Sequence, residues 1–368
     1  MKYDYLIVGC GLFGAVFAQK AIEAGKSVII IDKRDHIGGN CYTEEIEGVH
    51  VHRYGAHIFH TSDDEVWNYI NRFAKFNNYI HRVEAIYQGV PYSLPFNMKT
   101  FEKMWDVESP EEAQEIIKEQ IKRAKVRRIK NLEDQAISLV GTDIYNILIK
   151  GYTEKQWGKP CNKLPSEIIK RIPVRFTEDD NYFNDKYQGI PIGGYTRLIK
   201  ELVKGAVIVL NTNYKDFIAR SPDIAEKTIY TGPIDEFFEY KYGPLEYRTL
   251  RFEMQIYRQP AHMDRAVTNY TAADIPFTRI IDHKYFDDST QKDYDVVTHE
   301  YPIHYVVGKT EPYYPVNNKK NNRLYKKYLR RNKNKNLYFK GRLGEYKYYD
   351  MDDTIRSALD FAKKELNR

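Results

Sequence analysis

The 368-residue sequence predicts an α/β fold in which a Rossmann-like domain is interrupted by a small helical insertion and by an antiparallel β-sheet domain. Three observations predict it. An apolar run at 5–8 leads into a glycine-rich turn and a helix-like segment, and a second apolar run follows at 28–31. Between 99 and 150 the apolar residues take helical spacing. From 245 to 302 long alternating runs predict antiparallel strands.

The glycine-rich turn holds Gly9, Gly11 and Gly14, the spacing of a dinucleotide-binding βαβ unit. The first glycine makes the turn, the second lets backbone N–H groups approach a pyrophosphate, and the third lets the helix pack on the sheet. Asp32 ends the second apolar run, where a carboxylate can accept both ribose hydroxyls. These residues predict a dinucleotide site; a tight turn before a helix is the simpler alternative.

The residues after Asp32 narrow the choice of dinucleotide. Lys33 is followed closely by Gly38-Gly39, an extension typical of FAD-binding proteins of the glutathione-reductase type. A second close backbone approach is what the far end of a longer cofactor requires, although a glycine turn leaving the strand is the alternative. The last predicted helix, 352–366, would direct its N-terminal N–H groups at the anionic centre of a reduced flavin.

The other elements are predicted in order along the chain. We expect a helix at 63–74, a hairpin at 84–94, helices at 111–124, 131–140 and 142–149, a loop at 164–188, a helix at 193–204, parallel strands at 206–210 and 228–232, alternating strands at 246–257, 278–285 and 295–301, a helix at 323–331 and a strand and loop at 337–342. This order predicts a discontinuous FAD-binding domain (1–80, 190–244 and 325–368), a helical domain (98–163) and an antiparallel sheet domain for substrate (81–97, 164–189 and 245–324).

Composition excludes several classes of protein. Apolar residues make up 42% of the chain, and no apolar stretch approaches the ~20 residues of a membrane span. The N-terminus runs straight into the first strand, so we expect no signal peptide. Three widely spaced cysteines indicate free thiols in a reducing cytoplasm. The net charge of +6 is concentrated at 319–335, where a solvated helix face is favoured over a nucleic-acid patch.

Four clusters of side chains are candidates for chemistry: 54–61 with its two histidines, 151–158, 170–175 with the nearby Tyr182, and the tyrosine-rich pair 311–315 and 341–351. His57 and His60 have no suitably spaced third ligand, so polar contacts in a flavin pocket are favoured over a metal site. No Ser-His-Asp or Cys-His arrangement is present in the sequence. An enzyme built this way uses its cofactor for the chemistry.

These clusters, with 34–40, 187–191 and 345–350, closely resemble the bacterial UDP-galactopyranose mutases over essentially the full length. The resemblance implies interconversion of UDP-galactopyranose and UDP-galactofuranose, which supplies galactofuranose for cell-surface glycans. It implies that N5 of reduced FAD is the nucleophile at the anomeric carbon, with NAD(P)H or another donor as reductant. It also implies a cytoplasmic homodimer with a mobile loop near 164–177 that closes over the substrate.

The resemblance assigns roles to individual residues. Arg171 and Arg279 would bind the diphosphate and stabilise the departing UDP, and His60 would influence whether the 2-position of the sugar accepts an N-acetyl group. The implied substrate contacts are His81, Tyr152, Thr153, Trp157, Tyr182, Asn269, Tyr313 (with Tyr314 as its alternative) and Tyr348. The implied cofactor contacts are Gly9, Gly11, Phe13, Gly14, Asp32, Lys33, Gly39, Asn40, His57, Ile58, Arg342, Asp350 and Met351, with no metal.

Three alternatives remain open from the sequence. A mutase of the same family could accept UDP-N-acetylgalactosamine. A flavin oxidoreductase of the amine-oxidase type shares the nucleotide-binding fold but would transfer electrons to or from its substrate. A non-catalytic module could bind nucleic acid through the basic residues at 319–335, in a salt-sensitive way.

Overall fold

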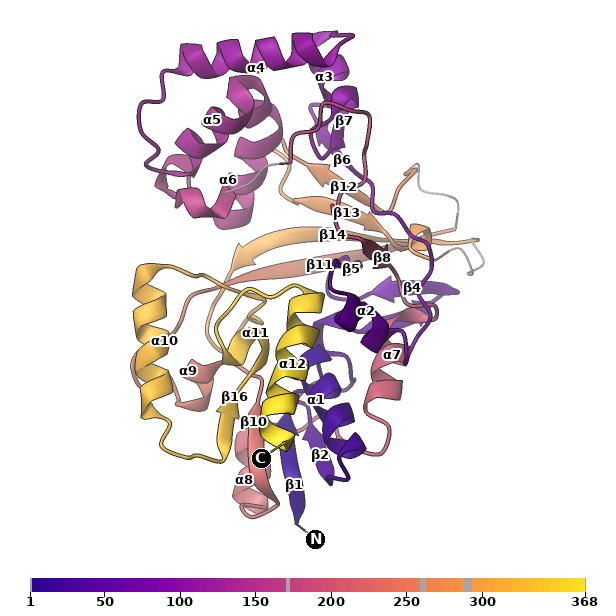
Figure 1. Ribbon diagram of the computed structural model, residues 1–368, viewed down its shortest axis with the longest axis vertical. Helices are drawn as coiled ribbons and strands as arrows, with labels where there is room; N and C mark the ends of the chain where they lie inside the picture. Colours follow the sequence, from indigo (N-terminus) through magenta and orange to yellow (C-terminus); the bar gives the residue numbers. More distant parts are fainter. Residues whose placement is uncertain (1, 170–172, 259–262, 288–292, 368) are drawn as a thin grey trace.

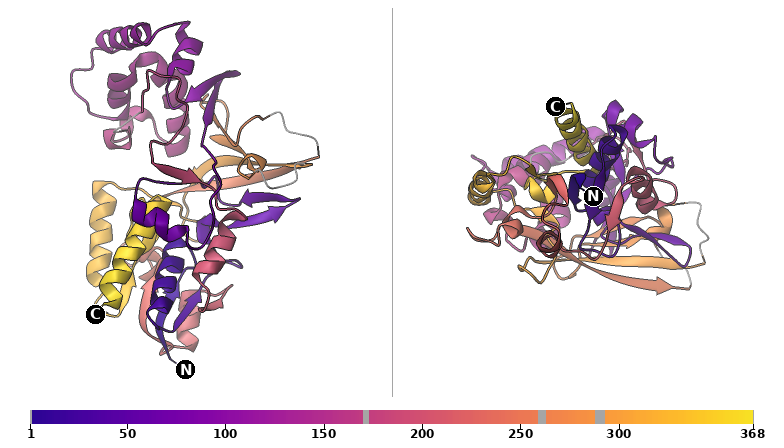
Figure 2. Two further views of the ribbon diagram at one scale, coloured as in Figure 1. Left: turned by 45° about the vertical axis from the view of Figure 1, so that its right-hand side comes forward. Right: turned by 90° about the horizontal axis from the view of Figure 1, so that it is seen from below.

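The computed structural model describes residues 2–169, 173–258, 263–287 and 293–367. Along the long axis of the molecule, a parallel sheet with its helices occupies the end that carries both termini (Figure 1). A larger sheet crosses the middle, and a group of helices forms the opposite end (Figures 1 and 2). The mixed α/β architecture predicted from the sequence is confirmed.

The parallel sheet has the order β16-β10-β1-β2-β9, and every neighbouring pair is parallel. Its strands are apolar runs because helices cover both faces of such a sheet. On one face α1 and α12 pack together, with Phe17 and Phe361 ring centroids 5.2 Å apart. The bounds are β1 Tyr3–Val8, α1 Leu12–Glu23, β2 Val28–Ile31, β9 Val207–Val209, β10 Ala225–Tyr230, β16 Leu337–Phe339 and α12 Met351–Leu366.

Three further helices accompany this sheet: α8 (Tyr214–Arg220), α9 (Ile234–Phe237) and α10 (Lys319–Arg331). α10 begins four residues before the predicted start, because Asn318 caps it by accepting a hydrogen bond from the N–H of Asn321 at 2.8 Å. The predicted domain boundary at 325 falls inside this helix. α10 buries Tyr328 and keeps most of its basic side chains exposed.

The middle sheet has seven strands in the order β15-β11-β14-β13-β12-β6-β7. The prediction of a purely antiparallel sheet is wrong at one place, because β6 pairs with β12 in parallel while the other pairs are antiparallel. β6 and β7 form the predicted hairpin, and β12, which follows β11 in the chain, runs beside β6 in the same direction. The bounds are β6 Val83–Tyr87, β7 Val90–Leu94, β11 Tyr247–Tyr257, β12 Val267–Tyr270, β13 Arg279–Asp282, β14 Asp295–His304 and β15 Tyr314–Pro315.

The helical end has its own apolar core, which includes Phe101, Leu132 and Val140. Gly141 (φ 79°) kinks α5, and Gln120 bridges the kink by accepting a hydrogen bond from the N–H of Asp143 at 2.9 Å. The segment predicted as a helix at 142–149 is a π-helical turn over Tyr145–Lys150. The bounds are α3 Met98–Trp105, α4 Pro110–Ala124, α5 Leu132–Ile144, α6 Gly151–Trp157 and the short turns Cys161–Lys163 and Ser166–Ile169.

Short elements connect the two sheets. β3 and β4 form a hairpin that was not predicted, and β5 pairs with β8, a strand inside the expected loop 164–188. α2 ends at Ile70, earlier than predicted. In the described part of the chain no helix is long and apolar enough to cross a membrane. The bounds are β3 Thr43–Ile46, β4 Val49–His52, β5 Phe59–Thr61, α2 Asp64–Ile70, β8 Tyr187–Gly189, α7 Gly194–Leu202, α11 Gly341–Gly344 and the 3-10 turns Gly39–Cys41 and His283–Tyr285.

A chain of buried histidines ties β4 to the middle sheet. His52 Nδ1 accepts a hydrogen bond from the N–H of His57 at 3.2 Å, and the N–H of His52 donates to His283 Nδ1 at 3.2 Å. The other ring nitrogen of His283 contacts Thr298 Oγ1 at 2.9 Å, and His52 stacks on Phe286. Burial lowers the pKa of His57 to about 4 and that of His283 to about 3, so both rings are neutral at pH 7.

We therefore expect the protein to lose stability in mild acid. In the unfolded chain these rings take up protons near pH 6.5, whereas in the native state they do not, so the free energy of unfolding falls as the pH falls. Between pH 7 and pH 5 the loss should be roughly 2 kcal/mol for each of the two histidines. Guanidinium unfolding curves at the two pH values measure it. The exposed His304 supplies the control, because His304→Gln should show the same loss in the free energy of unfolding between pH 7 and pH 5 as the parent. Equal stability of the parent at both pH values would contradict this expectation.

A second expectation concerns the glycine turn. A Cβ on Gly14 would lie 2.2 Å from the carbonyl oxygen of Gly9, whereas a Cβ on Gly11 would meet only the Cα of Gly39, at 3.8 Å. Gly14→Ala should lower the free energy of unfolding of the cofactor-free protein by about 2–3 kcal/mol, because backbone must move. Gly11→Ala should change it by less than about 0.5 kcal/mol. Denaturant titration of both variants checks the difference, and equal losses would refute it.

Candidate functional site

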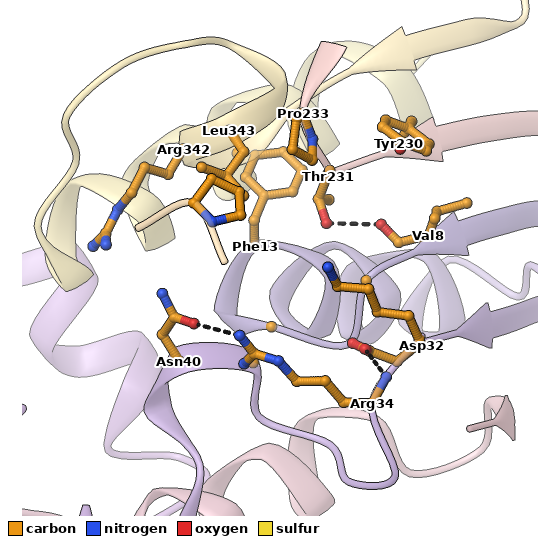
Figure 3. A pocket seen from close by; sticks show the side chains of 18 of the residues that line it. Val8, Phe13, Asp32, Arg34, Asn40, Tyr230, Thr231, Pro233, Arg342 and Leu343 are labelled. Atoms are coloured by element: carbon orange, nitrogen blue, oxygen red, sulfur yellow. Dashed lines mark hydrogen bonds between the residues drawn. The ribbon is translucent and has the colours of Figure 1, made fainter. Parts of the chain in front are cut away.

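A cavity of about 470 Å³ lies at the carboxyl ends of the parallel strands (Figure 3). This is the edge at which open α/β sheets bind ligands. The turn after β1 supplies Gly9 to Gly14, the end of β2 supplies Asp32, and the end of β10 supplies Thr231. Arg342 and Leu343 of α11 lie across the cavity from the side chains that follow β2 (Figure 3).

Two glycine turns meet at the floor of this first cavity. Gly9 has φ +105°, and a Cβ on Gly39 would come within 2.9 Å of the Cα of Gly11. The turns therefore touch through bare backbone. Gly11 is the N-cap of α1 and no side chain caps this helix, so its first N–H groups are available to an anionic ligand.

Asp32 is buried and uses both carboxylate oxygens. One accepts a hydrogen bond from the N–H of Cys10 at 2.7 Å and the other from the N–H of Arg34 at 2.9 Å. The carboxylate thus fixes the glycine turn and keeps lone pairs for ribose hydroxyls. The Arg34 guanidinium donates to Asn40 Oδ1 at 3.0 Å, and its Nη1 is buried without a partner in the protein (Figure 3). Lys33 Nζ forms an ion pair with Glu311 at 2.9 Å.

A second cavity, of about 300 Å³, lies against the middle sheet and α6. His57, Arg342 and Met351 line both cavities, so the two meet at these residues. Met351 is the first residue of α12, and Asp350 before it lines the second cavity. Burial raises the pKa of Asp350 above its usual value. An elongated ligand in the first cavity could therefore reach the second without crossing protein.

Arg279 lies at the centre of the second cavity. Its Nε is 3.3 Å from Glu300 Oε1, and its Nη2 donates to the Tyr152 hydroxyl at 2.9 Å. Burial alone would lower the pKa of this guanidinium, but Glu300 and Tyr152 hold it above the ordinary value. The charged partner expected for an arginine on a buried strand face is thus present. Nε still lacks a well-directed hydrogen bond.

Arg248 is a second arginine of this cavity that the sequence analysis missed. Burial lowers the pKa of its guanidinium, and Nε has no hydrogen-bond partner. No carboxylate of the described residues lies within ion-pair distance of it. The guanidinium carbon lies 4.5 Å from the Trp157 ring centroid and 5.7 Å from that of Tyr314. The only sign of Arg248 in the sequence was its position as a charged residue near the start of the predicted alternating strand 246–257. A buried cation of this kind favours an anionic ligand.

Two histidines of the cavity each have one ring nitrogen in a hydrogen bond with a neighbouring side chain. His60 Nδ1 lies 2.7 Å from Asp185 Oδ2, and because a carboxylate only accepts, Nδ1 carries the proton. His60 Nε2 is then an acceptor in the neutral ring. His81 Nδ1 lies 3.1 Å from the Tyr79 hydroxyl, and burial lowers the pKa of His81 to about 3. With that hydroxyl as donor, His81 Nε2 carries the proton and can donate.

The structure brings most of the sequence-predicted residues together. The first cavity is lined by Gly9, Gly11, Phe13, Gly14, Asp32, Lys33, Gly39, Asn40, His57, Arg342 and Met351. The second is lined by His57, Ile58, His60, His81, Tyr152, Tyr182, Asn269, Arg279, Arg342, Tyr348, Asp350 and Met351. Arg171 lies outside the described residues.

Three predicted substrate residues do not line the second cavity. Tyr313 lines the first cavity, whereas its neighbour Tyr314 lines the second, which favours the alternative that the sequence left open. Thr153 is buried. Trp157 contributes through its stacking on Arg248.

The residues present fit a flavin dinucleotide. The first cavity offers an uncapped helix terminus, a bare-backbone cradle and the unpartnered Arg34 Nη1. The second offers three buried polar atoms without partners: Arg248 Nε, Asn269 Oδ1 and Arg279 Nε. Such atoms are costly unless a ligand completes their hydrogen bonds. Within the described residues, no group of three or more His, Cys, Asp or Glu side chains is placed to hold a metal ion.

Comparison with known proteins identifies relatives of the whole chain. The family model of UDP-galactopyranose mutase matches residues 147–348, and that of the NAD(P)-binding Rossmann-like domain matches 7–73. The chain is 42% identical to a probable UDP-galactopyranose mutase of Klebsiella pneumoniae, over 99% of this chain and 95% of that protein. It is 38% identical to a dTDP-fucopyranose mutase of Escherichia coli, over 97% of each.

Solved structures agree on the fold. A crystal structure of reduced UDP-galactopyranose mutase superimposes with a TM-score of 0.74 at 15% identity, over 100% of this chain and 94% of the other. The flavoenzyme fold, the paired cavities and the identity over the full length lead to one conclusion: the chain belongs to the UDP-galactopyranose mutase family and is an enzyme.

Proposed function

We propose that this enzyme interconverts UDP-galactopyranose and UDP-galactofuranose, with FAD in the first cavity and the nucleotide sugar in the second. The observation that carries the proposal is the pair of partly buried arginines, Arg248 and Arg279, each with a buried Nε without a hydrogen bond, in a cavity that shares His57 and Arg342 with the dinucleotide cradle. Arg279 already has Glu300 as a partner, whereas Arg248 has none among the described residues, and a nucleoside diphosphate would supply the missing negative charge. The name of the relative that is 42% identical supports the choice of UDP-galactose.

In this proposal the protein holds the diphosphate and leaves the sugar at the junction of the cavities. Arg279 and Arg248 offset the charge that grows on the phosphates as UDP departs, and Arg171 adds a further cation. The hydroxyls of Tyr182, Tyr314 and Tyr348 donate hydrogen bonds to phosphate oxygens. Trp157 and Thr153 lie beside the nucleotide, and Tyr152 holds the Arg279 guanidinium in place. Asn269 completes the set of contacts.

At the junction, His60 and His81 would meet the hydroxyl groups of the sugar. His60 Nε2 can accept a proton or hydrogen bond, and Asp185 would stabilise the ring if it became charged. The His81 ring stays neutral, and with the Tyr79 hydroxyl donating to Nδ1 its Nε2 would donate there. The bound FAD, when reduced, supplies the nucleophilic nitrogen N5 for the anomeric carbon. Arg342, Asp350 and Met351 would hold its ring system.

Further proposals follow from the family. We place the enzyme in the cytoplasm as a homodimer, with NAD(P)H or another donor as reductant, supplying galactofuranose for cell-surface glycans. The FAD-binding unit would comprise residues 1–80, 190–244 and about 319–368. The last segment is taken from 319 because α10 begins there. The segment near 164–177 would close over the substrate.

A second candidate substrate is dTDP-fucopyranose. It is favoured by the relative of that name, which is 38% identical over almost the same length. Its sugar lacks the 6-hydroxyl of galactose, and its nucleoside carries a methyl group and lacks the 2′-hydroxyl. UDP-N-acetylgalactosamine is a third possibility, which would place its N-acetyl group near His60.

The proposal is tested by an assay with chemically reduced, flavin-loaded enzyme. UDP-galactofuranose should be converted to UDP-galactopyranose at many turnovers per enzyme without net consumption of reductant, while oxidised enzyme should be inactive. Chromatography of the nucleotide sugars under anaerobic conditions measures the conversion. Equal activity with and without reductant would overturn the role of reduced flavin. Stoichiometric use of NAD(P)H or oxygen would indicate an oxidoreductase instead, and faster turnover of dTDP-fucofuranose would establish the second candidate.

Arg279→Ala should nearly abolish turnover and leave FAD bound. Removing one member of a buried charge cluster costs roughly 2–5 kcal/mol, so kcat/KM should fall by about 30-fold to several thousand-fold. Arg251→Ala is the matched control, because this arginine of the same sheet is exposed and pairs only with Glu253 among the described residues. Flavin absorbance verifies the cofactor content of both variants. Normal turnover by Arg279→Ala would remove the diphosphate role of this residue.

A further inference from the structure

A lysine of α6 lies at the centre of a ring of backbone carbonyl groups. Lys155 Nζ donates hydrogen bonds to the carbonyl oxygens of Tyr270, Ala272, Ile275 and Phe277 at 2.6, 2.9, 3.0 and 3.0 Å. Tyr270 is the last residue of β12, and the other three belong to the connection between β12 and β13. One side chain thus satisfies most of the inward-facing acceptors of this turn.

Four carbonyl oxygens converge on one point only if a cation lies there. Their dipoles repel one another, and an ammonium group replaces the hydration shell that these oxygens would otherwise need, as a potassium ion does among filter carbonyls. Lys155 has three N–H bonds for four acceptors, so two acceptors share one of them. Burial lowers the pKa of Lys155 to about 8, against the opposing charge of Asp274. At neutral pH the group is mostly charged.

The turn held by Lys155 separates two residues of the second cavity. Asn269 lies in β12 and Arg279 begins β13, and the two are directly opposite each other in the strand register. On the helix side, Tyr152 lies one turn before Lys155 and accepts the hydrogen bond from Arg279 Nη2 at 2.9 Å. The contact is close-packed as well, since a Cβ on Gly151 would lie 2.2 Å from the carbonyl oxygen of Thr271.

We propose that Lys155 is a positioning residue. Its ammonium group takes the place of a monovalent cation in this carbonyl ring and so fixes α6 against the β12–β13 turn. This contact holds Tyr152 and Arg279 in the position in which they bind the diphosphate. The inference rests on the proposed nucleotide-sugar site. Lys155 itself does not line the second cavity. Its effect therefore passes through Tyr152 and Arg279.

The test is binding of UDP, measured by calorimetry on the full-length FAD-containing enzyme. Lys155→Met keeps the apolar stem and removes the cation, and it should weaken UDP binding tenfold or more. Tyr152→Phe should weaken it in the parent but have little further effect in the Lys155→Met background, because the pair is no longer held. A loss that is simply additive, or UDP affinity of Lys155→Met within twofold of the parent, would overturn the proposal.

Chemical rescue separates the cation from general packing. In Lys155→Ala, 100 mM n-propylammonium should restore part of the lost UDP affinity, whereas 100 mM tetramethylammonium, which has no N–H groups, should not. Equal effects of the two salts would count against the proposal. FAD content and thermal unfolding, recorded for each variant, report whether the fold is retained.

If neither variant folds, the parent enzyme supplies the test. After graded acetylation, peptide mass spectrometry measures the modification of each lysine and calorimetry measures UDP binding. UDP binding should be lost in step with acetylation of Lys155 and should not depend on acetylation of Lys215, which is 78% exposed. Full binding after complete acetylation of Lys155 would overturn the proposal. UDP binding is the quantity measured, so a negative result for Lys155 leaves the proposed reaction standing. Lack of turnover by the parent enzyme would instead remove the proposed function, and the positioning role of Lys155 would then be judged from UDP binding alone.

Discussion

The partly buried guanidinium of Arg279 makes the interaction on which the arrangement of this molecule depends. It begins β13, pairs with Glu300 of β14 and donates to Tyr152 of α6, so it joins the middle sheet to the helical end. A buried charge of this kind is tolerated only when its partners are in place. The helical insertion must therefore return to the sheet at this point, and the second cavity exists because it does.

The second cavity keeps polar atoms that the protein does not satisfy. Arg248, Asn269 and Arg279 each retain a buried nitrogen or oxygen without a hydrogen bond. This costs stability, and natural proteins accept such a cost mainly at functional sites. The carbonyl ring around Lys155 is the opposite case, because it is fully satisfied and rigid. A rigid support behind a set of unsatisfied groups is the arrangement expected of a preorganised site.

Local patterns predicted much of the fold and of the first cavity. Gly9, Gly11 and Gly14 specified the βαβ unit because their conformational roles act within a few residues of chain. The hairpin at 84–94 was predicted because the left-handed Gln88 and Gly89 mark its turn. β12 was missed because four residues carry too little alternation to be recognised, and its parallel pairing with β6 joins two strands that lie far apart in the sequence.

The sequence by itself determined the Rossmann-like unit and, through its motifs, the membership of the mutase family, because both depend on residue type and local spacing. The tertiary structure alone decided that Arg248 joins Arg279, that Tyr314 rather than Tyr313 lines the second cavity, and that Lys155 holds the turn between Asn269 and Arg279. These arrangements bring together residues from separate helices and strands, so no local pattern encodes them. They exist because burial of charge requires partners that only the folded chain can supply.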